Sequence, residues 1–272
     1  KLFSVSKRCK EDILFYLMFD DSKPVKPAIV LKLSSDLILE RGQPFLNEVA
    51  SLIAENRERY HFVIVSSGAI GLGQKKENLD ERPTSNAELQ RLASIGQLEL
   101  MKLWEKAFES TGQKITVAQQ LFTHGDLNNP NRNAIIAEQF DHHFEKGSIP
   151  IINENDTVSA REISFGDNDQ LAARVALMLG AQKLVLLTHN VPGLLDMTGK
   201  KFDADGKILD AEGKECDPES LVISDLNGVP DEIYENLSQR VGSRNKGGMS
   251  SKLLAAKIAA VATEVSTAHI MG

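Results

Sequence analysis

The chain has 272 residues, of which 42% are hydrophobic and 25% charged, ordinary values for a globular protein with a sizeable core. Its formal net charge of −7 argues against nucleic acid or an acidic membrane surface as the main partner, because both favour a basic protein face. No apolar run approaches the roughly 20 residues of a membrane span. We therefore expect no membrane-spanning segment, and Ile13–Phe19, which is followed by two aspartates, is too short for a signal peptide.

Residues 1–27 do not follow the pattern of the rest of the chain, and we expect an N-terminal extension of unknown role. Residues 28–272 form the predicted main domain. The two cysteines, Cys9 and Cys216, lie far apart in the sequence and lack the spacing of metal ligands. They are typical of reduced thiols in a cytoplasmic protein.

Strands and helices alternate along the main domain. In chain order, the patterns predict strands at 28–33, 61–65, 115–122, 149–153, 183–188 and 265–271, and helices at 44–56, 84–111, 132–146, 170–180 and after residue 252. Gly96 is expected to kink the second helix, and residues 198–206 are expected to form a surface hairpin. This alternation is typical of an α/β fold with a mainly parallel sheet.

Lys32 interrupts the first apolar strand, Ala28–Leu33. A buried lysine is costly unless its charge meets a partner. From this segment alone, a lysine on an edge strand that faces water is the more common situation, because lysines are mostly exposed.

Three turns have the composition of anion-binding sites: Ser34-Ser35, Ser66–Gly73 and Lys246–Ser251. Each follows a strand or precedes a helix, where backbone N–H groups can approach a phosphate closely. Lys252 falls in the first turn of the last helix, where its charge opposes the helix dipole. A bound anion would offset this unfavourable interaction with the dipole. The alternative interpretation is a lysine that is exposed to solvent.

Two polar clusters, Asn153–Asp156 and Asp167–Asp169, stand at a strand end and at a helix start, where α/β sheets bind ligands. Phosphoryl transfer requires positive charge, positioning and carboxylates, and Lys32, Lys252 and the two aspartates of the second cluster supply these groups. The chain lacks the P-loop motif Gly-x-x-x-x-Gly-Lys-Ser/Thr. It also lacks the protein-kinase motifs.

Four segments, in family order, resemble the glutamate 5-kinases of the amino acid kinase superfamily: VSSGAI at 65–70, PIINEND at 150–156, FGDNDQLAA at 165–173 and GGMSSKL at 247–253. The resemblance runs from about Ala28 to Gly272. It implies an open αβα sandwich and phosphorylation of the L-glutamate γ-carboxylate by ATP with Mg²⁺, the first step of proline biosynthesis. It also implies a cytoplasmic homodimer or homotetramer and feedback inhibition by proline. In family members the kinase domain continues beyond Gly272, and many bacterial members then carry a small RNA-binding-like domain, so we expect residues 28–272 to be an incomplete kinase domain without that second domain.

The resemblance also implies roles for individual residues. Lys32 and Lys252 would neutralise the transferring phosphoryl group, and Asp169 would hold both lysines. The substrate-binding residues would be Ser67 and Gly68 at a carboxylate, Asp156 at the α-ammonium, and Asn168 as a hydrogen-bonding group. Asn153, Glu154 and Asp167 would support the loop, and no residue is implied as a direct metal ligand. The implied nucleotide-binding residues are Lys32, Thr188, His189, Lys246, Gly247, Gly248, Met249, Ser250, Ser251 and Lys252.

Three departures from the family pattern fall on the nucleotide side. Ser34 stands where the family has glycine, His189 where it has aspartate, and Asn245-Lys246 where it has Gly-Thr. A side chain at position 34 could crowd a phosphate and restricts the backbone. We therefore expect any difference from the family to concern the nucleotide rather than glutamate.

Two alternatives stay open. One is a sibling kinase acting on N-acetylglutamate, aspartate or carbamate, which Asp156 argues against because an acid that faces an ammonium disfavours an N-acylated substrate. The other is a non-catalytic amino-acid sensor of the same fold, which the three departures favour and the intact phosphoryl-transfer residues oppose.

Overall fold

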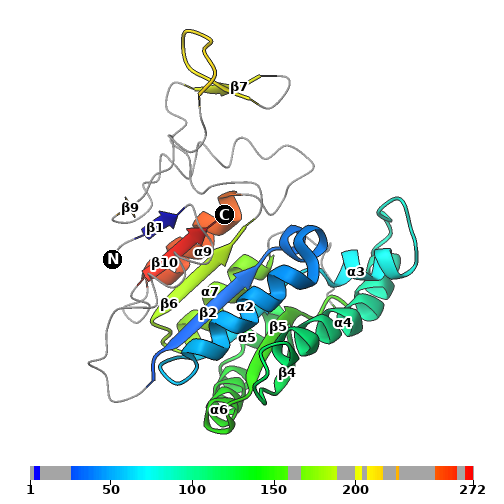
Figure 1. Ribbon diagram of the computed structural model, residues 1–272, viewed down its shortest axis with the longest axis vertical. Coiled ribbons are helices and arrows are strands. Elements are labelled where there is room, and N and C mark those ends of the chain that lie inside the picture. Colours follow the sequence, from blue (N-terminus) through cyan, green and yellow to red (C-terminus); the bar gives the residue numbers. More distant parts are fainter. Residues whose placement is uncertain are drawn as a thin grey trace.

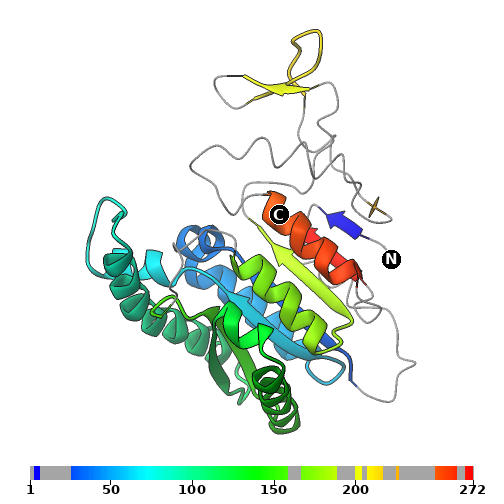
Figure 2. The ribbon, with the colours of Figure 1, turned by 180° about the vertical axis from the view of Figure 1, so that it is seen from behind.

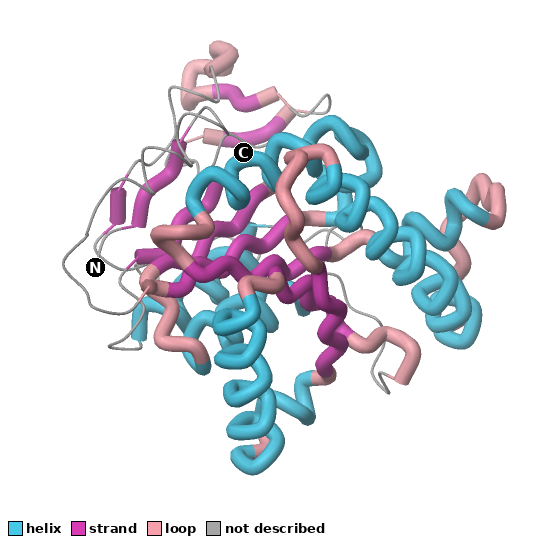
Figure 3. Tube along the Cα trace, turned by 60° about the horizontal axis from the view of Figure 1, so that its bottom comes forward, coloured by secondary structure: helices cyan, strands magenta, loops and turns pink. Residues whose placement is uncertain are grey.

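The computed structural model describes residues 3–6, 26–158, 167–188, 200–203, 207–216, 225–226, 249–261 and 267–271. Across these ranges an eight-stranded sheet runs in the order β4-β5-β3-β2-β6-β10-β1-β9. Neighbouring strands are parallel except for the β1–β9 pair. Helices cover both faces of this sheet (Figure 1; Figure 3), which confirms the predicted open αβα sandwich with a mainly parallel sheet.

The strands of the large sheet are β1 (Phe3–Ser6), β2 (Ala28–Leu33), β3 (His61–Ser66), β4 (Val117–Phe122), β5 (Ile149–Glu154), β6 (Lys183–Leu187), β9 (Asp225–Leu226) and β10 (Thr267–Met271). The helices are the π-helix η1 (Leu37–Arg41), α2 (Gly42–Asn56), α3 (Ala69–Lys76), α4 (Asn86–Glu109), α5 (His124–Asn128), α6 (Pro130–Lys146), α7 (Asp167–Met178) and α9 (Met249–Val261). A separate sheet pairs β7 (Lys201–Phe202) with β8 (Ile208–Leu209).

The predicted elements are present, with boundaries that differ by a few residues. Helix α7 begins at Asp167 rather than at Gln170. The predicted surface hairpin extends beyond residue 206, because Lys201 pairs with Leu209. Nothing in the sequence pattern of residues 1–27 predicted β1, which pairs with β10 and so lies in the same sheet as the main domain.

Side-chain alternation along β2 divides the interior into two core layers. Ile29, Leu31 and Leu33 pack with residues of η1, α2 and α4 on one face. Val30 packs on the other face with residues of α6, α7 and α9, which Figure 2 shows from behind. Lys32 follows the same two-residue period as Val30, so its side chain lies on the α7 and α9 face.

The position of β2 corrects the expectation that Lys32 lies on an edge strand. β2 lies between β3 and β6, and Lys32 is only 4% exposed. From β2 the chain continues into β3 on one side and later returns to β6 on the other. This is the topological switch point, and open α/β sheets bind ligands there, at the carboxyl ends of the strands.

Helices α3 and α4 pack very closely through two glycines. A Cβ atom at Gly96 would overlap the carbonyl oxygen of Ala69 and the backbone nitrogen of Gly73, and a Cβ at Gly73 would overlap the carbonyl oxygen of Leu92. Helix α4 is continuous through Gly96, where the sequence predicted a kink. The glycine therefore permits close helix packing, and this packing holds α3 over the end of β3.

Gly96→Ala is expected to lower the free energy of unfolding by about 3 kcal/mol, since backbone atoms cannot yield to the added methyl group. Urea denaturation measures the change. Gly125→Ala is the matched control, because an added Cβ there would meet only the Thr123 hydroxyl at 3.5 Å and should change stability by less than about 0.5 kcal/mol. Equal stabilities of the two variants would contradict this account of α3–α4 packing.

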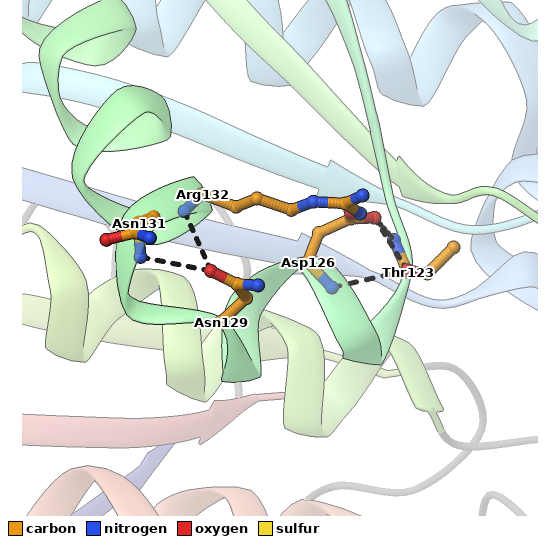
Figure 4. A network of polar contacts seen from close by, with 5 residues as sticks. All are labelled: Thr123, Asp126, Asn129, Asn131 and Arg132. Carbon is orange, nitrogen blue, oxygen red and sulfur yellow. Dashed lines mark hydrogen bonds and ion pairs between the residues drawn. The ribbon is translucent and has the colours of Figure 1, made fainter.

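The connection from β4 to α6 is held by side-chain caps (Figure 4). The Thr123 hydroxyl accepts a hydrogen bond from the Asp126 backbone, and the Asp126 carboxylate accepts one from the Thr123 backbone at 2.8 Å, which forms a capping box. Asp126 also pairs with Arg132, and the Asn129 side chain caps α6. These contacts fix the loop after β4, and the Phe122 carbonyl in turn accepts a 2.8 Å bond from the Asn155 backbone.

In the part of the chain that the structure describes, no helix is long and apolar enough to cross a membrane.

Candidate active site

Three buried charged residues meet at the carboxyl end of β2. Lys32 Nζ lies 2.6 Å from Asp169 Oδ1, and Lys252 Nζ lies 3.2 Å from Asp169 Oδ2. The side chains are 5%, 6% and 0% exposed for Lys32, Lys252 and Asp169. The structure therefore brings together the three residues that the sequence singled out for phosphoryl transfer, and we refer to them as the lysine–aspartate cluster.

Each member of the cluster comes from a different element. Lys32 lies on β2, Asp169 in the first turn of α7 and Lys252 in the first turn of α9. A carboxylate in the first turn of a helix is favoured by the helix dipole, whereas a lysine there is disfavoured. Lys252 is buried all the same, so its position favours a ligand that brings negative charge to this helix end.

The electrostatics of the cluster also favour a negatively charged ligand. Burial lowers the pKa of Lys32, and the charge of Asp169 only partly opposes this. Burial would raise the pKa of Asp169, but the charges and hydrogen bonds of Lys32 and Lys252 outweigh it and hold that pKa below its usual value. With Asp169 ionised, two ammonium groups share one carboxylate. The described cluster thus has a surplus positive charge in a buried place, which an anion would neutralise.

A second group of polar side chains lies beside the cluster, joined to it by α7. Asn168 Nδ2 donates to Ser67 Oγ and to Asn153 Oδ1, both at 2.8 Å. Asn153 is 2% exposed, while Ser67 and Asn168 are partly exposed. Because Ser67 Oγ accepts from Asn168, its hydroxyl hydrogen is left to donate to an acceptor such as a carboxylate.

Gly68 shapes the turn between β3 and α3. Its φ angle is +107°, a left-handed conformation that side chains rarely adopt. The turn places the first N–H groups of α3 directly after Ser67, at the carboxyl end of the sheet. This arrangement supports the predicted carboxylate contact at Ser67 and Gly68.

Asp156 lies on a cavity of about 350 Å³ next to these residues. The cavity extends between α3, α4 and the ends of β4 and β5, and the lysine–aspartate cluster does not line it. The charge of Asp156 acts on Arg82, whose pKa is lowered by burial, so Asp156 already has a cation nearby. The cavity is lined by Ala69, Ala93, Ser94, Gln97, Leu98, Gln119, Leu121, Asn153, Glu154, Asn155, Asp156 and Thr157.

The predicted nucleotide residues are only partly described. Thr188 follows β6 and is 9% exposed, and Ser251 in α9 is equally buried. Met249 and Ser250 begin α9, but their side chains lie outside the described residues. The remaining predicted residues, His189, Lys246, Gly247 and Gly248, lie wholly outside them.

Ser34, the departure at the first turn, has a buried hydroxyl oxygen with no hydrogen-bond partner among the described residues.

A model of the amino acid kinase family matches residues 27–271. The chain belongs to this family. It is 33% identical over 238 residues to a glutamate 5-kinase of Pelagibacter ubique, 36% over 254 residues to one of a Synechococcus species and 38% over 226 residues to one of Thermus thermophilus. The matches cover 85%, 88% and 82% of this chain but 59%, 62% and 54% of the relatives, so the chain spans less than two thirds of their length.

Solved structures agree with the amino acid kinase fold. Carbamate kinase from Giardia lamblia bound to AMP-PNP has a TM-score of 0.54 at 14% identity, over 91% of this chain and 93% of that one. An N-acetylglutamate synthase from Neisseria gonorrhoeae, complexed with coenzyme A and N-acetyl-glutamate, has a TM-score of 0.53 at 15% identity, over 91% of this chain and 54% of that one. At these identities the likeness shows the fold alone.

Two glutamines of this amino acid kinase were missed by the sequence analysis, Gln97 on α4 and Gln119 on β4. Both line the cavity, and Gln97 Nε2 donates to Gln119 Oε1 at 3.3 Å. A signal existed for Gln97, since it falls at helical spacing between the buried Ala93 and Leu100, on the face that enters the core. A polar residue on that face needs a partner. No such pattern marks Gln119.

Proposed function

We propose that this chain catalyses the ATP-dependent phosphorylation of the L-glutamate γ-carboxylate to glutamyl 5-phosphate. The observation that carries the proposal is the buried lysine–aspartate cluster with its surplus positive charge at the switch point of the sheet. The group of Ser67, Asn168 and Asp156 beside it offers what an amino acid requires, donors for a carboxylate and an acid for the ammonium. The similarity to curated glutamate 5-kinases supports the same substrate.

In this reaction an oxygen of the γ-carboxylate attacks the γ-phosphorus of ATP. The bond from phosphorus to the oxygen that bridges to the β-phosphate breaks, and ADP leaves with that electron pair. The attacking carboxylate is already ionised, so the step needs no general base. Lys32 and Lys252 would stabilise the charge on the transferring oxygens, and Asp169 would keep both ammonium groups in place.

Mg²⁺ fits this proposal as a companion of the nucleotide. Among the described residues there is no group of three or more histidine, cysteine, aspartate and glutamate side chains that could hold a metal. Both oxygens of Asp169 are engaged by lysines. Mg²⁺ usually retains several waters and is bound largely through substrate phosphates, where it would supply further positive charge.

Hydroxylamine trapping tests the proposal, because it converts an acyl phosphate to a stable hydroxamate. We expect hydroxamate from glutamate when ATP and Mg²⁺ are both present. For N-acetylglutamate we expect kcat/KM to be lower by about a hundredfold or more, because acylation removes the positive charge that Asp156 would attract and adds bulk at that position.

Equal or faster turnover of N-acetylglutamate, aspartate or carbamate would contradict the substrate and favour a sibling kinase. Glutamate binding in calorimetry with neither nucleotide binding nor hydroxamate would favour the sensor. The intact cluster argues against that outcome, because a sensor has no need of a buried, positively charged site for a transferring phosphoryl group.

Three further properties implied by the family remain predictions. They are a dimeric or tetrameric assembly, feedback inhibition by proline and a cytoplasmic location.

A further inference from the structure

A continuous row of side-chain amides links the cavity wall to the proposed glutamate residues. Gln97 Nε2 donates to Gln119 Oε1, and Gln97 Oε1 accepts from Asn153 Nδ2 at 2.9 Å. Asn153 Oδ1 then accepts from Asn168 Nδ2 at 2.8 Å, and the same Nδ2 donates to Ser67 Oγ at 2.8 Å. Each donor in the row meets an acceptor, so the orientation of one amide determines that of the next.

Gln97 supplies the acceptor for the Nδ2 group of Asn153 in this row. It is 9% exposed and comes from α4, whereas Asn153 comes from β5 and Asn168 from α7. Asn153 Nδ2 has no other acceptor among the described residues. Asn153 Oδ1 also accepts a hydrogen bond from the Glu154 backbone at 2.9 Å. Without Gln97 the Asn153 Nδ2 group would be buried and unpaired, which favours displacement of the side chain toward another acceptor. A displaced Asn153 would weaken the hydrogen bond that its Oδ1 accepts from Asn168 Nδ2.

We propose that Gln97 is a positioning residue for the amino-acid substrate, acting through Asn153 on Asn168 and Ser67. The proposal rests on the proposed glutamate kinase function and adds a residue outside the four family motifs. Gln97 lines the cavity, whereas none of the three residues of the lysine–aspartate cluster lines it. Its effect should therefore appear in the binding of glutamate and leave nucleotide binding unchanged.

Gln97→Met tests this inference, because methionine keeps the length of the side chain and removes both amide groups. We expect the KM for glutamate to rise by about tenfold to a hundredfold, as misplaced substrate contacts typically do. The KM for ATP should stay within about twofold, because the row ends at Ser67 and Asn168. Calorimetric titration of the protein with glutamate should show the same loss of affinity without any turnover.

Gln43→Met is the matched control. Gln43 is a partly buried amide on α2 whose Nε2 donates to the Leu103 carbonyl, so it also contacts α4, but away from the cavity. We expect wild-type constants for glutamate and ATP in this variant. A general loosening of α4 would instead raise the KM in both variants or for both substrates.

The outcomes separate the inference from the function on which it rests. If the wild-type protein makes no hydroxamate and binds no glutamate, both fail together. If the wild-type protein is active and Gln97→Met has the glutamate KM of Gln43→Met, only the role of Gln97 is overturned. Should Gln97→Met not fold, Gln97→Asn keeps a polar side chain that is one methylene too short for Asn153. The same selective rise is expected there, and an unchanged glutamate KM would refute the proposal.

Discussion

Replacing Asp169 by asparagine is expected to abolish measurable turnover and to lower the free energy of unfolding by about 3–5 kcal/mol at neutral pH. The change is nearly isosteric, so the loss comes from charge. Lys32 and Lys252 would face a neutral amide while 5% and 6% exposed. Removing one partner of a buried pair costs far more than the pair contributes, because the remaining charge stays desolvated.

The pH dependence of this variant gives a second test. Burial lowers the pKa of Lys32 below its ordinary 10.5, and loss of Asp169 removes the charge that opposes this shift. Between the lowered pKa of Lys32 and 10.5 the unfolded chain then binds more protons than the folded chain, so stability rises with pH through that range. The deficit relative to wild type should shrink as the pH rises from neutrality toward 10.5, measured by urea denaturation at each pH.

Asp141→Asn is the control for this variant, because Asp141 is an exposed carboxylate on α6. Its stability should stay within about 0.5 kcal/mol of wild type at every pH. If Asp169→Asn were equally mild and retained turnover, the cluster would be neither tightly coupled nor needed for the reaction.

Lys252→Met is expected to have a contrasting effect, with kcat lower by about a thousandfold or more and little change in stability. A positive charge on the transferring phosphoryl group contributes on the order of 10³–10⁵ to the rate of such enzymes. Methionine fills similar space, and its introduction leaves Lys32 and Asp169 as a matched pair without surplus charge. The KM for glutamate should stay within about threefold, since Lys252 acts on the phosphoryl group.

Steady-state kinetics and urea denaturation of the same sample check both parts of this prediction. Lys146→Met, an exposed lysine at the end of α6, controls for the loss of a positive charge and should keep wild-type kcat. A Lys252→Met variant that kept its kcat, or lost it only through unfolding, would remove Lys252 from the proposed chemistry.

The sequence predicted most of the fold, because strands and helices alternate with clear periodicity. For Lys32 the residues alone favoured a water-facing position on an edge strand, and only the family resemblance implied its pairing with Asp169. It could not place β2 at the centre of the sheet, because strand order depends on contacts far apart in the chain. The short strand β1 was missed for the same reason, as its pairing with β10 joins the two ends of the chain.

Some features of the candidate site could also be predicted from the sequence, whereas others depend on contacts between distant residues. Asn168 and Asp169 are adjacent in the polar cluster at the start of a predicted helix, so the residues alone predicted that both lie at a ligand-binding end of the sheet. Asp169 and Lys252 are 83 residues apart in the sequence, so no local pattern could show that they pair. Gln97 belongs to no motif, and its bond to Asn153 spans 56 residues. The sequence predicted a supporting role for Asn153, but only the structure shows that Asn153 links Gln97 to Asn168.

Oxygen tracing tests the central claim, transfer of a phosphoryl group to the γ-carboxylate, most directly. L-Glutamate labelled with ¹⁸O in both γ-carboxylate oxygens is incubated with the protein, ATP, Mg²⁺ and hydroxylamine, and the inorganic phosphate released is analysed by mass spectrometry. Hydroxylamine attacks the acyl carbon, so phosphate leaves with the former carboxylate oxygen and should carry one ¹⁸O per turnover. Phosphate without label, released at the same rate, would show simple ATP hydrolysis and would contradict the proposed reaction.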